Sequence, residues 1–273
     1  MESDALGDRM KMYERGGTPE RFMPLLPVMA RIDGRAFHSF VDGLSRPYDE
    51  RLSRLMIDTT KYLVKETGAV MGYCQSDEIS LCWYSGSADV QIFFDGRVAK
   101  LISQVAAMTS VYFYKLCSER LPPQYAAKLP TFDCRAWTVP NFQEAANTFL
   151  WRELDATKNS ISMAARSAYQ HKELENKNGS EMQEMLWQKG INWNDYPRFF
   201  KRGTFIQRKV VKHKFTTDEL DALPPLHQAR RNPELIFERS EYVELEMPPF
   251  NKVSNREAVI FQAAEPKLYA CAM

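Results

Sequence analysis

Two acidic loops are the features of this chain that point most directly to chemistry. Asp33 follows an apolar, strand-like stretch and precedes Gly34, and Asp77 stands in the run QSDE at residues 75–78. Hard divalent cations such as Mg²⁺ take oxygen ligands, commonly one or two carboxylates together with substrate phosphates. Two deprotonated carboxylates brought together on one sheet would bridge two cations about 4 Å apart. The pattern predicts a two-metal site for nucleotidyl transfer.

Simpler structural roles remain open for these acidic residues. Asp-Gly is a common turn dipeptide, so Asp33 is also compatible with an ordinary turn. Glu78 adjoins Asp77, and neighbours on a strand point to opposite faces, so Glu78 either supports the metal ligands or faces away. We keep Asp33, Asp77 and Glu78 as the candidate catalytic residues.

The residues that follow Asp33 predict a phosphate-binding turn. They are Gly34, Arg35, Ala36, Phe37 and His38. Successive backbone N–H groups in such a turn form a nest for phosphate oxygens, and His38 would donate to one of them. A buried or capping role is the alternative for His38.

A second basic feature lies near the start of a predicted helix. Arg97 and Lys100 are three residues apart and therefore share a helix face. They predict either a clamp on a triphosphate, with Lys as a point charge and Arg as a fork, or a solvated basic face.

The elements that must position these residues follow from the apolar periodicity. The spacing predicts a strand at 28–33, a helix at 49–65, a hairpin of strands at 69–74 and 79–84, a helix at 96–119 and a strand at 132–139. This β-α-β-β-α-β order is the split βαβ, or ferredoxin-like, arrangement. It brings the end of the first strand beside the hairpin tip, so that Asp33 and Asp77 approach each other. We expect an α+β fold with an antiparallel sheet and helices on one face.

A second segment follows the predicted sheet. Asn141 with Glu144 is typical of a capped helix start, and that helix is expected to reach residue 168. Residues 187–214 interleave aromatic and basic side chains, which indicates either a β-hairpin with charged faces or contact with RNA. We divide the chain into a catalytic domain, residues 1–140, and a helical and β-hairpin extension, residues 141–273, packed as one unit.

Composition limits the class of protein. The chain has 273 residues and a net charge of +1, so any contact with nucleic acid must come from local basic patches. The five cysteines show no CxxC spacing, which favours reduced thiols in a cytoplasmic protein. No apolar run approaches the length of a membrane span, and no signal peptide is expected.

Six motifs occur in the order typical of a known family. They are RIDGRAFHSF, LSRPYDER, YCQSDEIS, GRVAK, FLWRELDATKNSISMAA and KRGT. Over roughly residues 5–212 the chain thereby resembles the tRNA-histidine guanylyltransferases. The resemblance implies a polymerase palm-like catalytic domain that adds nucleotides to the 5′ end of tRNA. It also implies two Mg²⁺ ions, ATP and GTP or other nucleoside triphosphates as substrates, and a homotetramer.

The resemblance also implies roles for individual residues. Asp33, Asp77 and the carbonyl of Gly34 match the metal ligands. The positions that match nucleotide-binding residues are Arg35, Ala36, Phe37, His38, Arg46, Asp49, Ser76, Arg97 and Lys100. Contacts with tRNA are expected from Lys158, Asn159, Lys201 and Arg202.

One motif departs from the family pattern. Members that add an untemplated guanosine carry the run HINNLYN, whereas residues 157–163 here read TKNSISM. The chain thus resembles the bacterial, archaeal or phage-like branch of the family, whose members favour template-dependent repair of shortened tRNA 5′ ends. The alternatives are a dedicated tRNA-histidine guanylyltransferase, a nucleotide cyclase with a similar two-metal sheet, and a non-enzymatic tRNA-binding module.

Overall fold

The fold is built on one six-stranded antiparallel sheet. The structure, a computed structural model, describes residues 21–232 and 234–270. The strand order is β4-β1-β3-β2-β5-β6. The strands are β1 (Val28–Gly34), β2 (Met71–Gln75), β3 (Glu78–Trp83), β4 (Phe132–Thr138), β5 (Thr204–Lys214) and β6 (Ile236–Glu244). The first four have the β-α-β-β-α-β order predicted from the sequence, and β5 extends the sheet by pairing with β2.

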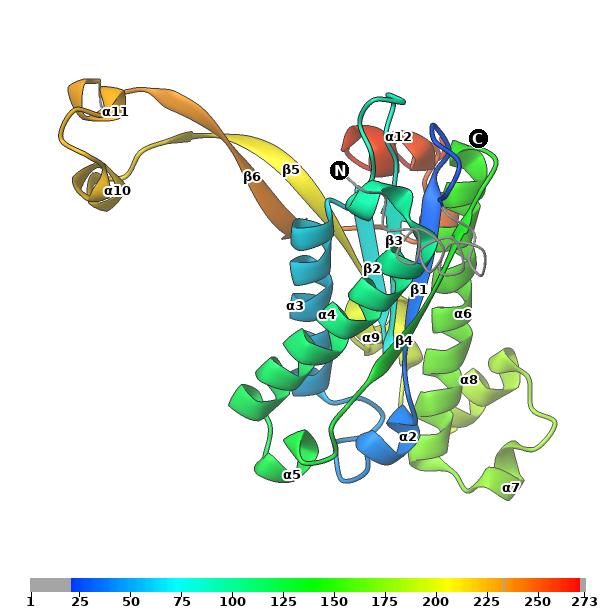
Figure 1. The fold of residues 1–273 in the computed structure, drawn as a ribbon. Helices are drawn as coiled ribbons and strands as arrows, with labels where there is room; N and C mark the ends of the chain where they lie inside the picture. Colours follow the sequence, from blue (N-terminus) through cyan, green and yellow to red (C-terminus); the bar gives the residue numbers. More distant parts are fainter. Residues whose placement is uncertain (1–20, 233, 271–273) are drawn as a thin grey trace, which may run out of the picture.

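Helices cover both faces of the sheet (Figure 1). Helices α3 (Glu50–Thr67) and α4 (Val98–Arg120) pack on the face that carries Ala30 and Ile32. Helices α6 (Phe142–Ala168) and α12 (Arg256–Gln262) pack on the opposite face, against Met29. The prediction of helices on one face therefore holds for α3 and α4, while the extension supplies a second layer. Both faces of β1 are covered, since Ala30 and Ile32 are buried on one face and Met29 on the other, while Arg31 and Asp33 are partly exposed.

Local signals in the sequence explain where the long helices begin and end. The carboxylate of Asp49 accepts hydrogen bonds from the N–H groups of Arg51 and Leu52, at 3.0 and 3.4 Å, and starts α3. The helix ends at Gly68, whose φ of 68° is the left-handed conformation that glycine adopts without strain. Asn141 caps α6 by accepting from the N–H of Glu144 at 2.8 Å, as predicted.

Shorter elements connect and extend this frame. They are α2 (Phe37–Phe40), η1 (Phe93–Gly96), α5 (Pro123–Ala126), α7 (His171–Leu174), α8 (Gly179–Gln188), η2 (Trp193–Asp195), α9 (Arg198–Arg202), α10 (Thr217–Ala222), α11 (Gln228–Arg231) and η3 (Phe250–Lys252). Beyond β2, strands β5 and β6 continue as a two-stranded arm that projects from the body and carries α10 and α11 at its tip (Figure 1). The sheet thus crosses the predicted domain boundary at residue 140.

Two expectations about the class of protein can be compared with the described residues. Within residues 21–232 and 234–270, no helix has the length and apolar character that crossing a bilayer requires. Cys74, Cys82, Cys117 and Cys134 are free and buried, and burial raises the pKa of each thiol. Cys271 lies outside the described residues.

Candidate active site

The structure brings the two acidic loops together at one end of the sheet. The N–H of Gly34 donates to the carbonyl oxygen of Asp77 at 3.1 Å. The pairing of β1 with β3 sets Asp33 directly opposite Glu78. Because directly opposed residues of an antiparallel pair point to the same face, the Asp33 and Glu78 side chains share the face covered by α6.

The Asp77 carboxylate lies in an environment that disfavours its own charge. Burial raises the pKa of Asp77, the nearby Asp33 carboxylate raises it further, and a hydrogen bond donated by the Ser76 hydroxyl at 2.9 Å opposes the shift. A cation between Asp33 and Asp77 would relieve this repulsion. The donor set therefore fits a divalent cation.

The ligand count suggests which cation fits. Within the described residues there is no group of three or more His, Cys, Asp or Glu side chains arranged for a metal. Two carboxylates and the carbonyl of Gly34 leave positions for water and substrate phosphates, which is how Mg²⁺ is usually held. Zinc, which commonly takes three or four protein side chains, fits this set poorly.

Glu78 is engaged differently from Asp33 and Asp77. Arg152 on α6 forms a two-pronged ion pair with its carboxylate, with N–O distances of 2.6 and 2.8 Å. Arg31 lies 3.8 Å from the same carboxylate. Glu78 therefore does not face away from Asp33; it neutralises arginines beside the site and anchors α6 to the sheet.

Sequence reasoning missed several charged neighbours of Asp33. Asp133 on β4 is paired with Asp33 across the sheet, so Asp33 lies between Asp133 and Glu78. Asp133 therefore adds a negative charge opposite Asp33, which is unfavourable, while the charge of Glu78 is already paired with Arg152 and Arg31. Arg152 was present in the motif FLWRELDATKNSISMAA, but only the packing of α6 shows that it reaches Glu78.

The predicted phosphate turn divides into a buried part and an exposed part. Phe37 is 4% exposed and packs against Phe113 and Phe132, so its side chain belongs to the core and does not face a ligand. A Cβ on Gly34 would lie 2.2 Å from the Phe37 ring, which requires glycine at this position. Ala36, with φ 53°, and His38 are exposed next to it and remain available to a phosphate.

Other predicted nucleotide-binding residues lie at the same end of the sheet. Asp49 starts α3, and the hydrogen bond from Arg51 is the main reason that its pKa falls to about 2. Because Asp49 also accepts from the N–H of Ser45, its carboxylate is largely used within the protein. Ser76 and Arg46 are exposed.

Arg97 and Lys100 do not join this site. Both are exposed at the start of α4, where Arg97 lies 3.8 Å from Asp95 and Lys100 lies over the Phe94 ring. The other part of α4 reaches the site, since the Ser110 hydroxyl accepts from the N–H of Phe132, which pairs with Gly34. Ten residues of helix separate Lys100 from Ser110, about 15 Å. Within one chain, the predicted clamp by Arg97 and Lys100 is therefore not assembled beside Asp33.

The predicted tRNA-binding residues lie on α6 and α9. Lys158 and Asn159 are exposed on α6, and Asn159 donates to Asp155, which pairs with Arg152. Lys201 donates to the carbonyl of Asn194 and lies 5.5 Å from the centre of the Trp193 ring. The backbone of Arg202 is fixed by the Tyr73 hydroxyl, which donates to its carbonyl at 2.8 Å.

Glu153, on the buried side of α6, should make the free energy of unfolding depend on pH in an unusual way. It is 3% exposed, and burial raises its pKa to about 7, although the N–H of Phe250 and the charge of Arg202 oppose the shift. A carboxyl whose pKa is raised in the fold stabilises the folded state at pH values below its pKa of 4.5 in the unfolded chain. This contribution is lost as the pH rises through 7. We expect wild-type unfolding free energy to fall, relative to Glu153→Gln, by on the order of 3 kcal/mol between pH 4.5 and 8.

Urea unfolding of the two proteins at several pH values would measure this difference. Gln keeps an oxygen that can accept from Phe250 but carries no titrating proton, so it isolates the carboxyl. Parallel curves for wild type and variant across this range would contradict the prediction.

Comparisons with known proteins find the same family by sequence and by structure. Residues 7–140 match the family described as Thg1, tRNAHis guanylyltransferase. A tRNA(His) guanylyltransferase of Debaryomyces hansenii is 30% identical over 73% of this chain and 79% of its own. A bacterial Thg1-like protein solved in complex with ATP is 34% identical, with a TM-score of 0.76 over 94% of this chain and 99% of that chain. One solved with GTP is 33% identical, with a TM-score of 0.68 over 91% and 95%.

Proposed function

The chain belongs to the Thg1 family of tRNA(His) guanylyltransferases and is a nucleotidyltransferase, and on that premise we propose that it repairs the 5′ ends of tRNA by template-dependent addition of nucleotides in the 3′-to-5′ direction. The observation that carries the proposal is the convergence of Asp33 and Asp77, joined through the hydrogen bond from Gly34 to the Asp77 carbonyl. The sheet that holds them has the strand order β4-β1-β3-β2, which supports a polymerase palm-like catalytic domain.

The proposed reaction has two transfers at phosphorus. In the first, an oxygen of the tRNA 5′-phosphate attacks the α-phosphorus of ATP, the bond to the β-phosphate breaks, and pyrophosphate leaves. In the second, the 3′-hydroxyl of an incoming nucleoside triphosphate attacks the activated 5′-phosphorus, the hydroxyl proton is released, and AMP leaves. Each step exchanges one phosphoester or phosphoanhydride bond for another, so atoms and electrons balance.

The residues of the chain have separate roles in these transfers. Asp33, Asp77 and the carbonyl of Gly34 would hold Mg²⁺, which supplies charge neutralisation for pyrophosphate and a lower pKa for the attacking hydroxyl. Ser76 orients the Asp77 carboxylate by its hydrogen bond. The exposed turn at Ala36 and His38 is placed to hold triphosphate oxygens, and Glu78 with Arg152 keeps β3 and α6 in register behind the site.

Two observations favour repair over dedicated addition of guanosine to tRNA-histidine. The run TKNSISM at residues 157–163 departs from the HINNLYN motif of the members that add an untemplated guanosine. Among the solved structures, the bacterial Thg1-like protein with ATP covers 94% of this chain at 34% identity, whereas a tRNA(His) guanylyltransferase of Saccharomyces cerevisiae covers 77% at 26% identity. The incoming base would be selected by pairing with the opposite strand of the acceptor stem, and GTP is then one of several substrates. Assembly as a homotetramer remains a prediction.

Incorporation of labelled nucleotides tests the proposal. With 5′-monophosphorylated tRNAs, ATP and four triphosphates, we expect tRNAs that lack one or two 5′ nucleotides to be extended until the acceptor stem is fully paired. Intact tRNA-histidine should be a poorer substrate. EDTA should abolish transfer because it removes the Mg²⁺ that would neutralise the triphosphate beside the two carboxylates.

Product length on a gel separates the alternatives. Addition of one guanosine to intact tRNA-histidine in preference to truncated tRNAs would support the dedicated guanylyltransferase. A cyclic nucleotide formed from ATP or GTP without RNA would support a cyclase. Binding of tRNA without any metal-dependent product would leave a binding module and would overturn the proposed function.

A further inference from the structure

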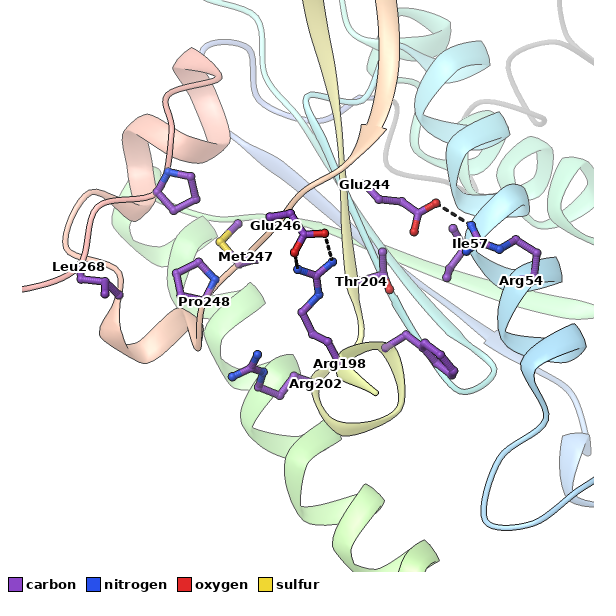
Figure 2. A pocket seen from close by; sticks show the side chains of 12 residues that line it. Arg54, Ile57, Arg198, Arg202, Thr204, Glu244, Glu246, Met247, Pro248 and Leu268 are labelled. Atoms are coloured by element: carbon purple, nitrogen blue, oxygen red, sulfur yellow. Dashed lines mark hydrogen bonds and ion pairs between the residues drawn. The ribbon is translucent and has the colours of Figure 1, made fainter. Parts of the chain in front are cut away.

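An arginine-lined pocket lies beside the candidate active site, and of its lining residues only Arg202 has been assigned an expected role so far. Its volume is about 730 Å³, and its walls come from α3, α9, the start of β5 and the segment after β6. The lining residues with charged side chains are Arg54, Arg198, Arg202, Glu244 and Glu246. Figure 2 shows Arg54 on one side of the pocket and Arg198 and Arg202 on the other, with Thr204 between them.

The pocket is continuous with the turn that carries the catalytic carboxylate. Ile57, Phe199 and Thr204 line it and also line a small crevice that includes Gln75 and Ser76. Thr204 pairs with Cys74 across β5 and β2, three residues before Asp77. Three residues span at most about 10 Å, and the chain turns at Ser76, so a ligand in the pocket would approach the reacting phosphates.

The charges of the pocket are arranged for an exchangeable anion. Arg198 pairs with Glu246, whose side chain is 92% exposed, and exposed ion pairs of this kind contribute little stability. Arg54 shares Glu244 with Lys61. Displacement of Glu246 by a phosphate would therefore cost little and would free the Arg198 guanidinium.

Arg202 supplies the clearest sign of a missing partner. Its Nε atom is buried and has no hydrogen-bond partner within the described residues, and Arg202 forms no ion pair there. The Glu153 carboxylate on α6 is close enough for the two charges to interact. A buried guanidinium N–H without an acceptor is unfavourable, and because Arg202 lines the pocket, a small rotation of its side chain would let the guanidinium pair with a phosphate there.

We propose that this pocket binds backbone phosphates of the tRNA substrate, which positions the 5′ end at Asp33 and Asp77; the inference rests on the proposed function. A free triphosphate carries its charge within one compact group and would require donors that converge on it. The arginines here line two separate walls (Figure 2), a spacing that suits successive phosphates of one strand. Met247, Pro248 and Leu268 add an apolar rim that a ribose or base can contact.

Equilibrium binding of 5′-monophosphorylated tRNA in EDTA tests the pocket without turnover. Arg198→Gln and Arg202→Gln should each lower affinity about tenfold, because a charge-assisted hydrogen bond is lost. Each should also make the slope of log K against log salt shallower by about 0.7–0.9, the value for one phosphate contact. Glu246→Gln should raise affinity, since it frees Arg198.

Arg166→Gln is the matched control, because Arg166 is exposed on α6 outside the pocket. Thermal unfolding of every variant checks the fold, and Arg198→Gln keeps the test valid if Arg202→Gln is unstable. If both pocket variants bind tRNA as Arg166→Gln does, or lose affinity for ATP or GTP instead, the inference is wrong. Failure of the proposed function would appear separately, as wild-type protein that binds tRNA but extends no truncated tRNA.

Discussion

Replacement of Asp77 by Asn is expected to lower nucleotide transfer by about a thousandfold or more while the fold stays intact. A metal ligand that stabilises the transferred phosphates contributes several kcal/mol to the transition state, and each 1.4 kcal/mol is a factor of ten in rate. The side chain keeps its size, and its oxygen can still accept from the Ser76 hydroxyl. Stability should be unchanged or higher, because burial and the Asp33 charge disfavour the native carboxylate, as the raised pKa of Asp77 shows.

Incorporation of labelled GTP into a 5′-truncated tRNA measures this effect, with thermal unfolding as the check of the fold. Asp89→Asn is the matched control, since Asp89 is an exposed carboxylate on the loop between β3 and η1. The control should transfer at the wild-type rate. Near wild-type incorporation by Asp77→Asn would remove the central argument for the metal site.

Replacement of Arg152 by Met is expected to lower the free energy of unfolding by about 3 kcal/mol at neutral pH. The Arg152 and Glu78 side chains are 10% and 18% exposed, so the substitution leaves a largely buried carboxylate with Arg31 as its remaining partner. Burial already raises the pKa of Glu78 despite Arg152, and loss of the arginine would raise it further. A carboxyl with a raised pKa loses its stabilising contribution as pH rises, so the defect should be larger at pH 8 than at pH 5.

Urea unfolding at these two pH values measures the defect and its sign. The double variant Glu78→Gln with Arg152→Met should recover part of the stability, because no unpaired charge then remains buried. Arg120→Met is the comparison variant: Arg120 pairs with Asp58 on the surface, where an ion pair contributes about 1 kcal/mol or less. Equal losses for Arg120→Met and Arg152→Met would refute the buried role of Arg152.

These two variants distinguish a residue needed for nucleotide transfer from an ion pair needed for stability at the same site. Asp77 and Glu78 are neighbours in the sequence but have different surroundings. Asp77 lies in the turn, where the charge of Asp33 acts on it, whereas Glu78 lies in β3 and is paired with Arg152. A transfer defect without a stability defect is expected for Asp77. The Arg152 and Glu78 pair is expected to show mainly the reverse.

Local patterns in the sequence determined the elements of the first half of the chain. The apolar alternation at 28–33, the cap at Asp49 and the glycine at position 68 fix β1 and α3 through short-range effects, which a single sequence displays. The β-α-β-β-α-β order leaves few sheet topologies, and the convergence of Asp33 and Asp77 follows from it. These are the parts of the site that could be predicted.

Contacts between distant segments were decided by the tertiary structure alone. Arg152 reaches Glu78 across 74 residues, and Phe37 turns into the core away from the phosphate turn. Arg97 and Lys100 lie toward the far end of α4, with about 15 Å of helix between Lys100 and Ser110, the residue that contacts β4 beside the site. The pocket formed by Arg54, Arg198 and Arg202 likewise requires α3, α9 and the segment after β6 to pack together. Apolar periodicity in the sequence indicates which face of a helix is buried. Which strand or helix packs on that face depends on contacts between distant segments, and a single sequence does not display those contacts.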